Sequence, residues 1–208
     1  MKILLIILLP LLLISCGLDT REHYFELEDF SEGKVYYFSC EEDSLYDVYL
    51  KIKSEPEKQL LSTTTYGFAG TPTAEFVEKY KEEGSELVAF SLLNGEAVES
   101  FKVIENDVFK WAVTDEPFSY SVTSADGMQM TNTRNYFTRA HMDIMGEKYE
   151  VLGFKDVISY TTSSISFTER KYYAEGMGLV GIELEEGDQV YHLRLSDILS
   201  MKEWKDRF

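Results

Sequence analysis

The sequence predicts a mainly β protein, an antiparallel and strongly curved sheet or half-barrel with two short helices at about 71–83 and 196–205. Three observations lead to this prediction. Many short segments alternate apolar with polar residues, which is the period of a half-buried strand. Turn signals rich in glycine and asparagine separate these segments at short intervals. Aromatic residues make up 14% of the chain, and such large side chains suit the concave face of a curved sheet.

The first expected strands show the pattern well. Residues 34–40 form an aromatic run, and the segment 45–54 follows it after a short turn. In that segment Val48, Leu50 and Ile52 alternate with polar or aromatic residues, so they share one face of a strand. The later expected strands cover 59–66, 87–93, 96–104, 108–113, 118–123, 128–142, 148–160, 164–174, 180–184 and 191–195.

Two expected hairpins determine how neighbouring strands pair. Asn94-Gly95 is a strong two-residue turn signal, because both central positions of such a turn need positive φ. Near the C-terminus, residues 180–184 and 191–195 flank an acidic turn that contains glycine. Their apolar side chains can lie on one common face, so this second hairpin has the clearest pattern in the chain.

The strongest internal helix signal covers residues 71–83. Thr71 can act as an N-cap, Pro72 suits the first helical position, and Gly84 suits the position after the end. The expected apolar stripe consists of Phe76, Val77 and Tyr80. A second helix is expected over 196–205, capped by its first residue.

The first seventeen residues indicate a lipoprotein signal. Lys2 supplies a positive start, residues 3–14 form an apolar run, and positions 13–16 read Leu-Ile-Ser-Cys, the form of a bacterial lipobox. The lipobox needs a thiol, because the diacylglyceryl group is attached to the cysteine sulfur. We therefore expect cleavage before Cys16 and acylation of that residue.

The length and composition of this segment argue against two kinds of helix. A transmembrane helix needs about 20 apolar residues, more than this run supplies. A buried core helix at the extreme N-terminus would need a polar face for the solvent. An ordinary secretory signal with an incidental cysteine stays open. The expected organisation is a signal peptide (1–15), a lipidated tether (16–23) and a single β-rich domain (24–208).

The acidic composition restricts the expected partners. The chain has 20 basic and 37 acidic side chains and a net charge of −17, which becomes −18 when Lys2 leaves with the signal peptide. Such a chain repels nucleic acid and anionic lipid headgroups. The lipid anchor on Cys16 is therefore the expected membrane attachment. The expected location is the bacterial cell envelope, at the outer membrane and facing the periplasm.

No pattern in the sequence indicates a reaction centre. His23, His141 and His192 are scattered, and none has a partner at the spacing of metal ligands. The chain has neither a G-x-S-x-G nucleophile elbow nor a glycine-rich phosphate loop. We therefore expect a protein that is not an enzyme, with no catalytic residues, no metal site and no cofactor.

The second cysteine is expected to be buried and unreactive. Once Cys16 is acylated, Cys40 has no cysteine partner within the chain. It lies in an aromatic strand, where a cysteine usually behaves as a small apolar side chain. The acidic residues that follow it would raise the pKa of its thiol and so reduce its reactivity.

One stretch resembles a known group of proteins. Residues 171–182, KYYAEGMGLVGI, resemble the YYAKGVGLV strand-turn-strand near the C-terminus of many lipoproteins, especially from Bacteroidota. The aromatic-x-Leu opening and the glycine before an aromatic strand in that group are similar to residues 24–27 and 33–37. Glu175 stands where the pattern often has lysine. The resemblance implies a fold similar to the half-barrels of periplasmic lipoprotein carriers, and it transfers no functional residue.

Two functional hypotheses follow from the sequence. The first is a structural or protein-interaction role in the cell envelope, with an envelope protein as the partner. The second is a carrier or sensor that binds an apolar ligand or lipid on the concave, aromatic face of the sheet. The sequence identifies no ligand-binding residue, and it does not say whether that face is open or filled by side chains.

Overall fold

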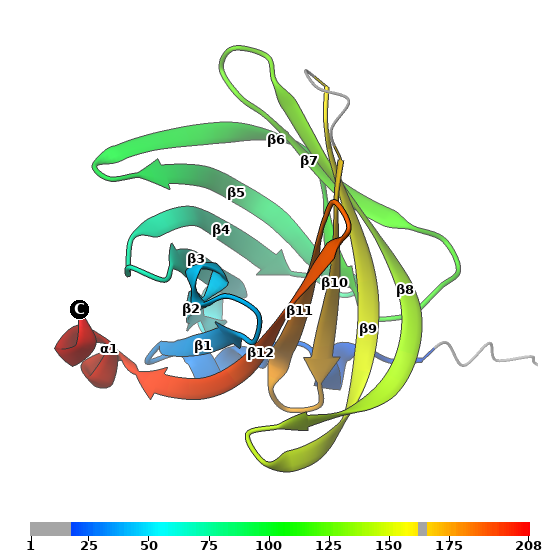
Figure 1. The fold of residues 1–208 in the computed structure, drawn as a ribbon. Helices are drawn as coiled ribbons and strands as arrows, with labels where there is room; N and C mark the ends of the chain where they lie inside the picture. The colour runs from blue at the N-terminus through cyan, green and yellow to red at the C-terminus, as the bar shows by residue number, and fades with distance from the viewer. Residues whose placement is uncertain (1–17, 162–165) are drawn as a thin grey trace, which may run out of the picture.

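The computed structural model describes residues 18–161 and 166–208, so the expected signal peptide and Cys16 lie outside the described residues. In this part of the chain, twelve antiparallel strands form one closed barrel in the order β1-β12-β11-β10-β9-β8-β7-β6-β5-β4-β3-β2. Figure 1 shows the strands curving around a central space. Each strand pairs with two neighbours, so the sheet that these residues form has no free edge.

The strands are β1 (Lys34–Cys40), β2 (Val48–Glu55), β3 (Leu60–Gly67), β4 (Pro72–Tyr80), β5 (Gly84–Asn94), β6 (Ala97–Lys110), β7 (Phe118–Thr123), β8 (Gln129–Ile144), β9 (Glu147–Tyr160), β10 (Ser166–Ala174), β11 (Gly178–Glu186) and β12 (Gln189–Ser200). The helices are the 3-10 turns η1 (Arg21–His23), η2 (Leu27–Phe30), η3 (Ser44–Tyr46) and η4 (Pro56–Lys58), and the α-helix α1 (Met201–Arg207). None of these helices has the length and hydrophobicity that crossing a bilayer requires.

The predicted fold class, mainly β with a strongly curved antiparallel sheet, is confirmed, and the curvature is sufficient to close the sheet. Closure depends on the pairing of the first strand with the last, where Lys34 faces Ser200 and Cys40 faces Leu193. These partners are more than 150 positions apart in the sequence. The barrel is therefore complete only when both ends of the domain are in place.

Both predicted hairpins are confirmed. Asn94 pairs with Ala97 across the β5–β6 turn, and Gly95 adopts the positive φ of 61° that the turn requires. In the β11–β12 hairpin Ile182 faces Leu193, so apolar side chains of the two strands lie side by side.

The helix predicted over 71–83 is wrong, because these residues form strand β4. In the strand, Ala74, Phe76 and Glu78 alternate inward and line the interior cavity. The inward position of a carboxylate interrupts the apolar alternation, which is why the helical spacing looked stronger than the period of two. A proline at the first position of a strand is compatible with pairing there.

The C-terminal helix is confirmed but begins later than the predicted range, 196–205, because β12 continues to Ser200. The N-cap is Ser200 and not Ser196. Its hydroxyl accepts a hydrogen bond from the Glu203 backbone N–H at 3.2 Å, and the Glu203 carboxylate accepts one from the Ser200 N–H at 2.8 Å. This capping box directs α1 so that Trp204 is buried on the outer face of the barrel.

The N-terminal segment, residues 18–30, covers one end of the barrel, which we call the N-terminal end. The β4–β5, β6–β7 and β10–β11 connections lie at this end. Hydrogen bonds join the segment to these connections, linking Thr20 to Trp111 (2.9 Å), Glu22 to Gly176 (2.8 Å) and Phe25 to Tyr80 (2.6 Å). Residues 18–23, the described part of the predicted tether, are therefore attached to the barrel.

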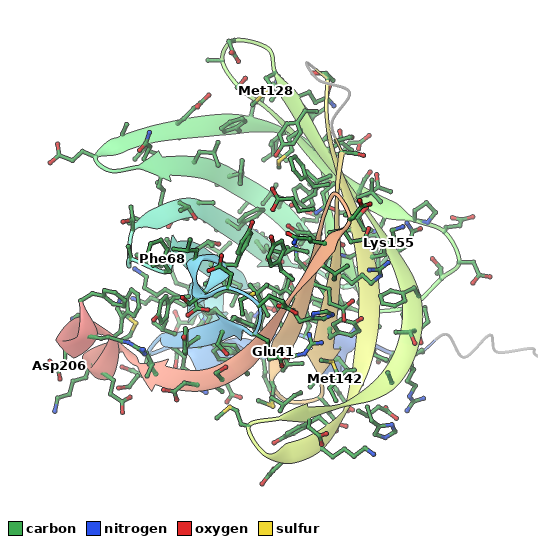
Figure 2. The ribbon with its side chains drawn as sticks, in the orientation of Figure 1. Glu41, Phe68, Met128, Met142, Lys155 and Asp206 are labelled. Atoms are coloured by element: carbon green, nitrogen blue, oxygen red, sulfur yellow. The ribbon has the colours of Figure 1, made fainter. Side chains whose placement is uncertain are left out.

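The opposite end of the barrel carries the β3–β4, β5–β6, β7–β8 and β11–β12 connections. In Figure 1 the N-terminal segment enters from the side away from the β5–β6 hairpin. Figure 2 labels Phe68 and Met128 at the opposite end and Met142 near the N-terminal end. Exposed apolar side chains are frequent on the connections and strand ends there, and they include Leu45, Phe68, Leu92, Val98, Phe167 and Val190.

Candidate functional site in the barrel interior

A cavity of about 410 Å³ occupies the interior of the barrel, and every strand except β1 contributes to its lining. This volume lies within the usual range of small-molecule sites. The wall is mainly apolar and extends to residues close to the connections of the opposite end. Its apolar side chains include Phe76, Phe90, Leu92, Met130, Ile158 and Leu184.

A buried ionic network lies on one side of this cavity. The Asp156 carboxylate, which is fully buried, accepts hydrogen bonds from Arg134 Nε at 2.6 Å and from Arg134 Nη2 at 2.7 Å. Lys171 Nζ lies 3.1 Å from the same carboxylate and 2.8 Å from that of Glu169. The network forms because Arg134 faces Asp156 across the β8–β9 pair and Glu169 faces it across the β9–β10 pair. The bidentate geometry of the Arg134–Asp156 pair makes this pair a strong and specific contact.

The pKa values of this network favour the charged forms. Burial raises the pKa of Asp156, but the adjacent Arg134 and Lys171 cations lower it by more than burial raises it. The pKa of Asp156 therefore lies well below its usual range. Burial lowers the pKa of Lys171, and the neighbouring Glu169 and Asp156 carboxylates more than offset this effect. The cations Arg134 and Lys171 thus lie against the carboxylates of Asp156 and Glu169 in one network.

Glu78 lies on β4, on the other side of the cavity, and its side chain is only 6% exposed. Its Oε2 accepts hydrogen bonds from the Tyr24 hydroxyl at 2.8 Å and from the Ser85 hydroxyl at 2.7 Å. Burial raises the pKa of Glu78, although both hydroxyl donors and the more distant Arg134 act in the opposite direction. Among the described residues, Glu78 thus accepts from two neutral hydroxyls and forms no ion pair.

Three buried rings, one of them from the N-terminal segment, form a floor at the N-terminal end of the cavity. Tyr24 stacks on Phe109 with 4.3 Å between the ring centroids, and Phe109 meets Tyr173 edge-on at 5.1 Å. The Arg134 guanidinium lies 5.6 Å from the Phe109 centroid and 5.8 Å from that of Tyr173. The floor therefore connects the ionic network to the N-terminal segment through cation–π and aromatic contacts.

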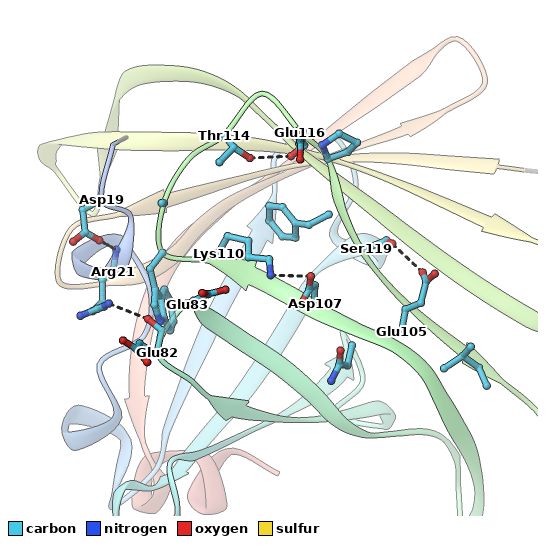
Figure 3. A pocket seen from close by; sticks show the side chains of 16 residues that line it. Asp19, Arg21, Glu82, Glu83, Glu105, Asp107, Lys110, Thr114, Glu116 and Ser119 are labelled. Carbon is cyan, nitrogen blue, oxygen red and sulfur yellow. Dashed lines mark hydrogen bonds and ion pairs between the residues drawn. The ribbon is translucent and has the colours of Figure 1, made fainter. Parts of the chain in front are cut away.

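A second hollow, of about 1310 Å³, lies on the outer surface beside the β6–β7 connection (Figure 3). Most of its charged side chains are acidic and exposed. Among them Lys110 pairs with Asp107 at 2.8 Å, and Arg21 Nη2 donates to the Glu82 carbonyl at 3.4 Å. An acidic surface also serves solubility. The interior cavity is the better candidate site, because it combines buried apolar walls with a few convergent polar groups.

The structure bears on only one of the two cysteines. Cys16, the predicted lipidation site, lies outside the described residues. Cys40 is buried, as predicted, and its thiol donates to Glu42 Oε2 at 3.3 Å. Burial is the main cause that raises the pKa of this thiol. Cys40 therefore has the environment of an unreactive cysteine.

The three histidines have different surroundings. His23 is buried in η1, and within the described residues neither of its ring nitrogens has a hydrogen-bond partner. Burial is the main cause that lowers its pKa. His141 is exposed on β8, and His192 Nδ1 lies 2.6 Å from Glu42 Oε1. Among the residues the structure describes, no group of three or more His, Cys, Asp or Glu side chains could hold a metal ion.

Sequence reasoning did not single out the polar groups of the cavity. The signal that could have found them is the strand period, because Arg134 stands two and four positions after Asn132 and Met130, both of which are buried. Lys171 likewise precedes the buried Tyr173 by two positions. A charged residue two or four positions from a buried residue of the same strand points to the same, inward face. The sequence alone does not tell which face of the strand is the inward one.

The C-terminal motif, residues 171–182, forms the end of β10, a tight turn and the start of β11. Gly176 and Gly178 have φ values of 70° and 76°, a conformation that glycine adopts without strain. A side chain at Gly178 would overlap the ring of Phe25. The opening and closing motifs of the domain therefore contact one another at the N-terminal end.

Comparison with known proteins identifies the fold but no family. No protein-family model matches the chain, and no curated protein matches it. A Bacteroides fragilis protein, named as exported and as having a YmcC-like fold, is 13% identical, with a TM-score of 0.51 over 81% of this chain and 96% of that chain. The barrel is therefore similar in fold to that protein.

Two further solved structures are weaker matches. A Parabacteroides distasonis protein named as a lipoprotein is 13% identical, with a TM-score of 0.47 over 81% of this chain and 97% of that chain. The Escherichia coli hypothetical lipoprotein YmcC is 8% identical, with a TM-score of 0.41 over 85% of this chain and 90% of that chain.

Proposed function

We propose that this protein is a lipid-anchored protein of the bacterial cell envelope that acts by binding, not by catalysis, and that its barrel holds an apolar chain. The cavity of about 410 Å³ with its apolar wall carries the proposal. Transfer of an apolar chain from water into such a space releases about 0.8 kcal/mol for each methylene buried. The carrier or sensor hypothesis therefore has a specific site.

A binding role also agrees with the state of the charged groups. Arg134 and Asp156 neutralise one another, as do Lys171 and Glu169, so the network offers no free base or nucleophile to a substrate. Two observations support the envelope location. The chain has a lipobox, and one protein of similar fold is named as exported. We place the anchor at the outer membrane, with the barrel in the periplasm.

The ligand-binding proposal predicts that filling the cavity abolishes binding. Ala74→Trp, on the cavity wall, is expected to weaken the binding of a fluorescent apolar probe at least tenfold, about 1.4 kcal/mol. Val88→Trp is the matched control, because Val88 is 44% exposed on β5. Fluorescence titration with N-phenyl-1-naphthylamine measures both variants.

Two outcomes of this titration would contradict the ligand-binding proposal. They are the absence of probe binding to the unaltered protein and an equal loss of affinity in both variants. Failure of probe binding would favour the structural or protein-interaction hypothesis. The candidate surface for a cationic envelope protein would then be the acidic hollow beside the β6–β7 connection (Figure 3).

The anchor is tested separately from the cavity. Cys16→Ser is expected to leave an unprocessed precursor that no longer incorporates radiolabelled palmitate, because the thioether requires the cysteine sulfur. The domain should still fold, which circular dichroism of the purified protein checks. Cys40→Ser is the control and should keep normal labelling, since Cys40 is buried in β1. Unchanged labelling of Cys16→Ser would refute the lipobox assignment.

A further inference from the structure

The charged groups of the cavity lining, together with Asp156 directly behind it, comprise two cations and three carboxyl groups. Arg134 and Lys171 are balanced by Asp156 and Glu169, and all four lie within one network on β8, β9 and β10. Glu78, on β4, is the remaining carboxyl group in the lining. A ligand that fills the cavity therefore meets one acidic group without a cationic partner in contact with it.

The geometry of Glu78 leaves one of its oxygens for a ligand. The Tyr24 and Ser85 hydroxyls both donate their hydrogen bonds to Oε2 of Glu78. Among the described residues, no hydrogen-bond donor is on Oε1, although the side chain is more than nine-tenths buried. Oε1 is not among the fully buried side-chain atoms that lack a partner, so it keeps accessible surface and can accept a hydrogen bond from a ligand in the cavity.

The cavity is also polarised along the barrel. Glu78 lies beside the aromatic floor, because it is hydrogen-bonded to Tyr24, which stacks on Phe109. The wall toward the opposite end is mainly apolar, with side chains such as Phe76 and Leu92, and its ionic groups Lys171 and Glu169 are paired with each other. A ligand with one polar end and one apolar chain would therefore lie with its polar end at the floor.

We propose, resting on the proposed apolar-chain binding, that the preferred ligand is an amphiphile whose polar end is a cationic amine that donates a hydrogen bond to Glu78. An amine supplies both the missing donor and the missing positive charge. A hydroxyl end supplies the donor alone. A carboxylate or phosphate end supplies neither, and the ionised form of Glu78 would repel it.

Three amphiphiles that share one chain test this inference with the unaltered protein. Dodecylamine, dodecanol and dodecanoate, each below its micelle concentration at pH 7, would be titrated by displacement of the bound apolar probe. We expect dodecylamine to bind at least tenfold more tightly than dodecanol, and dodecanoate to bind most weakly. Equal or tighter binding of dodecanoate would overturn the inference, because it would show that Glu78 does not act as the acceptor for a cationic donor.

A variant distinguishes the role of Glu78 from general packing. Glu78→Gln keeps an acceptor for both hydroxyls, and it is expected to lower dodecylamine affinity at least tenfold while dodecanol affinity changes less than threefold. Glu75→Gln, an exposed position on the same strand, is the matched control and should change neither. An equal loss for amine and alcohol in Glu78→Gln would overturn the inference.

The two proposals fail in different ways. If dodecanol and the probe bind but the amine has no advantage, only the inference on the polar end is wrong. If none of the three amphiphiles binds the unaltered protein, the proposed function fails and this inference fails with it. The ranking of ligands by the unaltered protein remains decisive even if Glu78→Gln does not fold.

Discussion

Asp156→Asn is expected to lower the free energy of unfolding by about 3–5 kcal/mol, which is the usual cost of removing one partner from a buried ion pair. Asp156 is fully buried and lies within 3.1 Å of both Arg134 and Lys171. Without its charge, Glu169 alone would balance two cations in an apolar interior. Urea unfolding at pH 7, followed by tryptophan fluorescence, measures the change.

An exposed ion pair provides the control. Glu150 Oε1 lies 2.6 Å from Arg139 Nη2, but the side chains are 34% and 54% exposed. Glu150→Gln is therefore expected to change stability far less than Asp156→Asn does, because solvent screens an exposed ion pair. If the two variants had similar stabilities, the buried network would not be a main contributor to the stability of the fold.

The effect of Asp156→Asn should also depend on pH. Because the folded-state pKa of Asp156 lies well below its unfolded value of about 3.9, the carboxylate stabilises the folded protein fully above that value. This contribution is lost as the pH falls further. The stability difference between the unaltered protein and the variant should thus be constant above about pH 5 and narrow below about pH 4. A difference that grows on acidification would contradict this account.

Phe109→Ala is the second substitution with a large expected effect, about 3–5 kcal/mol of lost stability. Phe109 is fully buried and contacts Tyr24, Phe154 and Tyr173, with ring centroids 4.3, 4.9 and 5.1 Å away. Its removal would leave a cavity within the aromatic floor and would also remove a ring that faces Arg134. Thermal and urea unfolding measure the loss.

A phenylalanine at the opposite end of the barrel is the matched control. Phe68 is 53% exposed in the β3–β4 connection, so Phe68→Ala should change stability by less than about 0.5 kcal/mol. A comparable loss in both variants would show that the floor is not a special part of the core. Retention of full stability by Phe109→Ala would refute its role in joining the barrel to the N-terminal segment.

The strand pattern predicted much of this fold because most strands expose one face. The turn at Asn94-Gly95 and the pairing of Ile182 with Leu193 follow from local chemistry, that is, from positive φ and from alternation. The closure of the barrel does not, because it depends on pairing between β1 and β12, and no local signal specifies partners so distant in the sequence.

The candidate site was harder to predict than the fold, because it also depends on contacts between residues that are distant in the sequence. Arg134, Asp156 and Lys171 are charged residues at inward positions, and composition alone assigns such residues to the surface. At Glu78 the inward carboxyl group also interrupts the apolar alternation of β4, and this led to the wrong prediction of a helix there. Their burial makes sense only when the opposing strands and the N-terminal segment supply the partners.

The attachment of the N-terminal segment has a consequence for how the protein would sit at a membrane. The Leu18 carbonyl accepts a hydrogen bond from the Val113 N–H at 3.0 Å, so the chain is already attached two positions after Cys16. Two extended residues span at most about 7 Å. With a lipid on Cys16, the barrel would stand directly on the bilayer and not on a long stalk. Its covered end would then face the lipid, and the opposite end of the barrel would face the aqueous side.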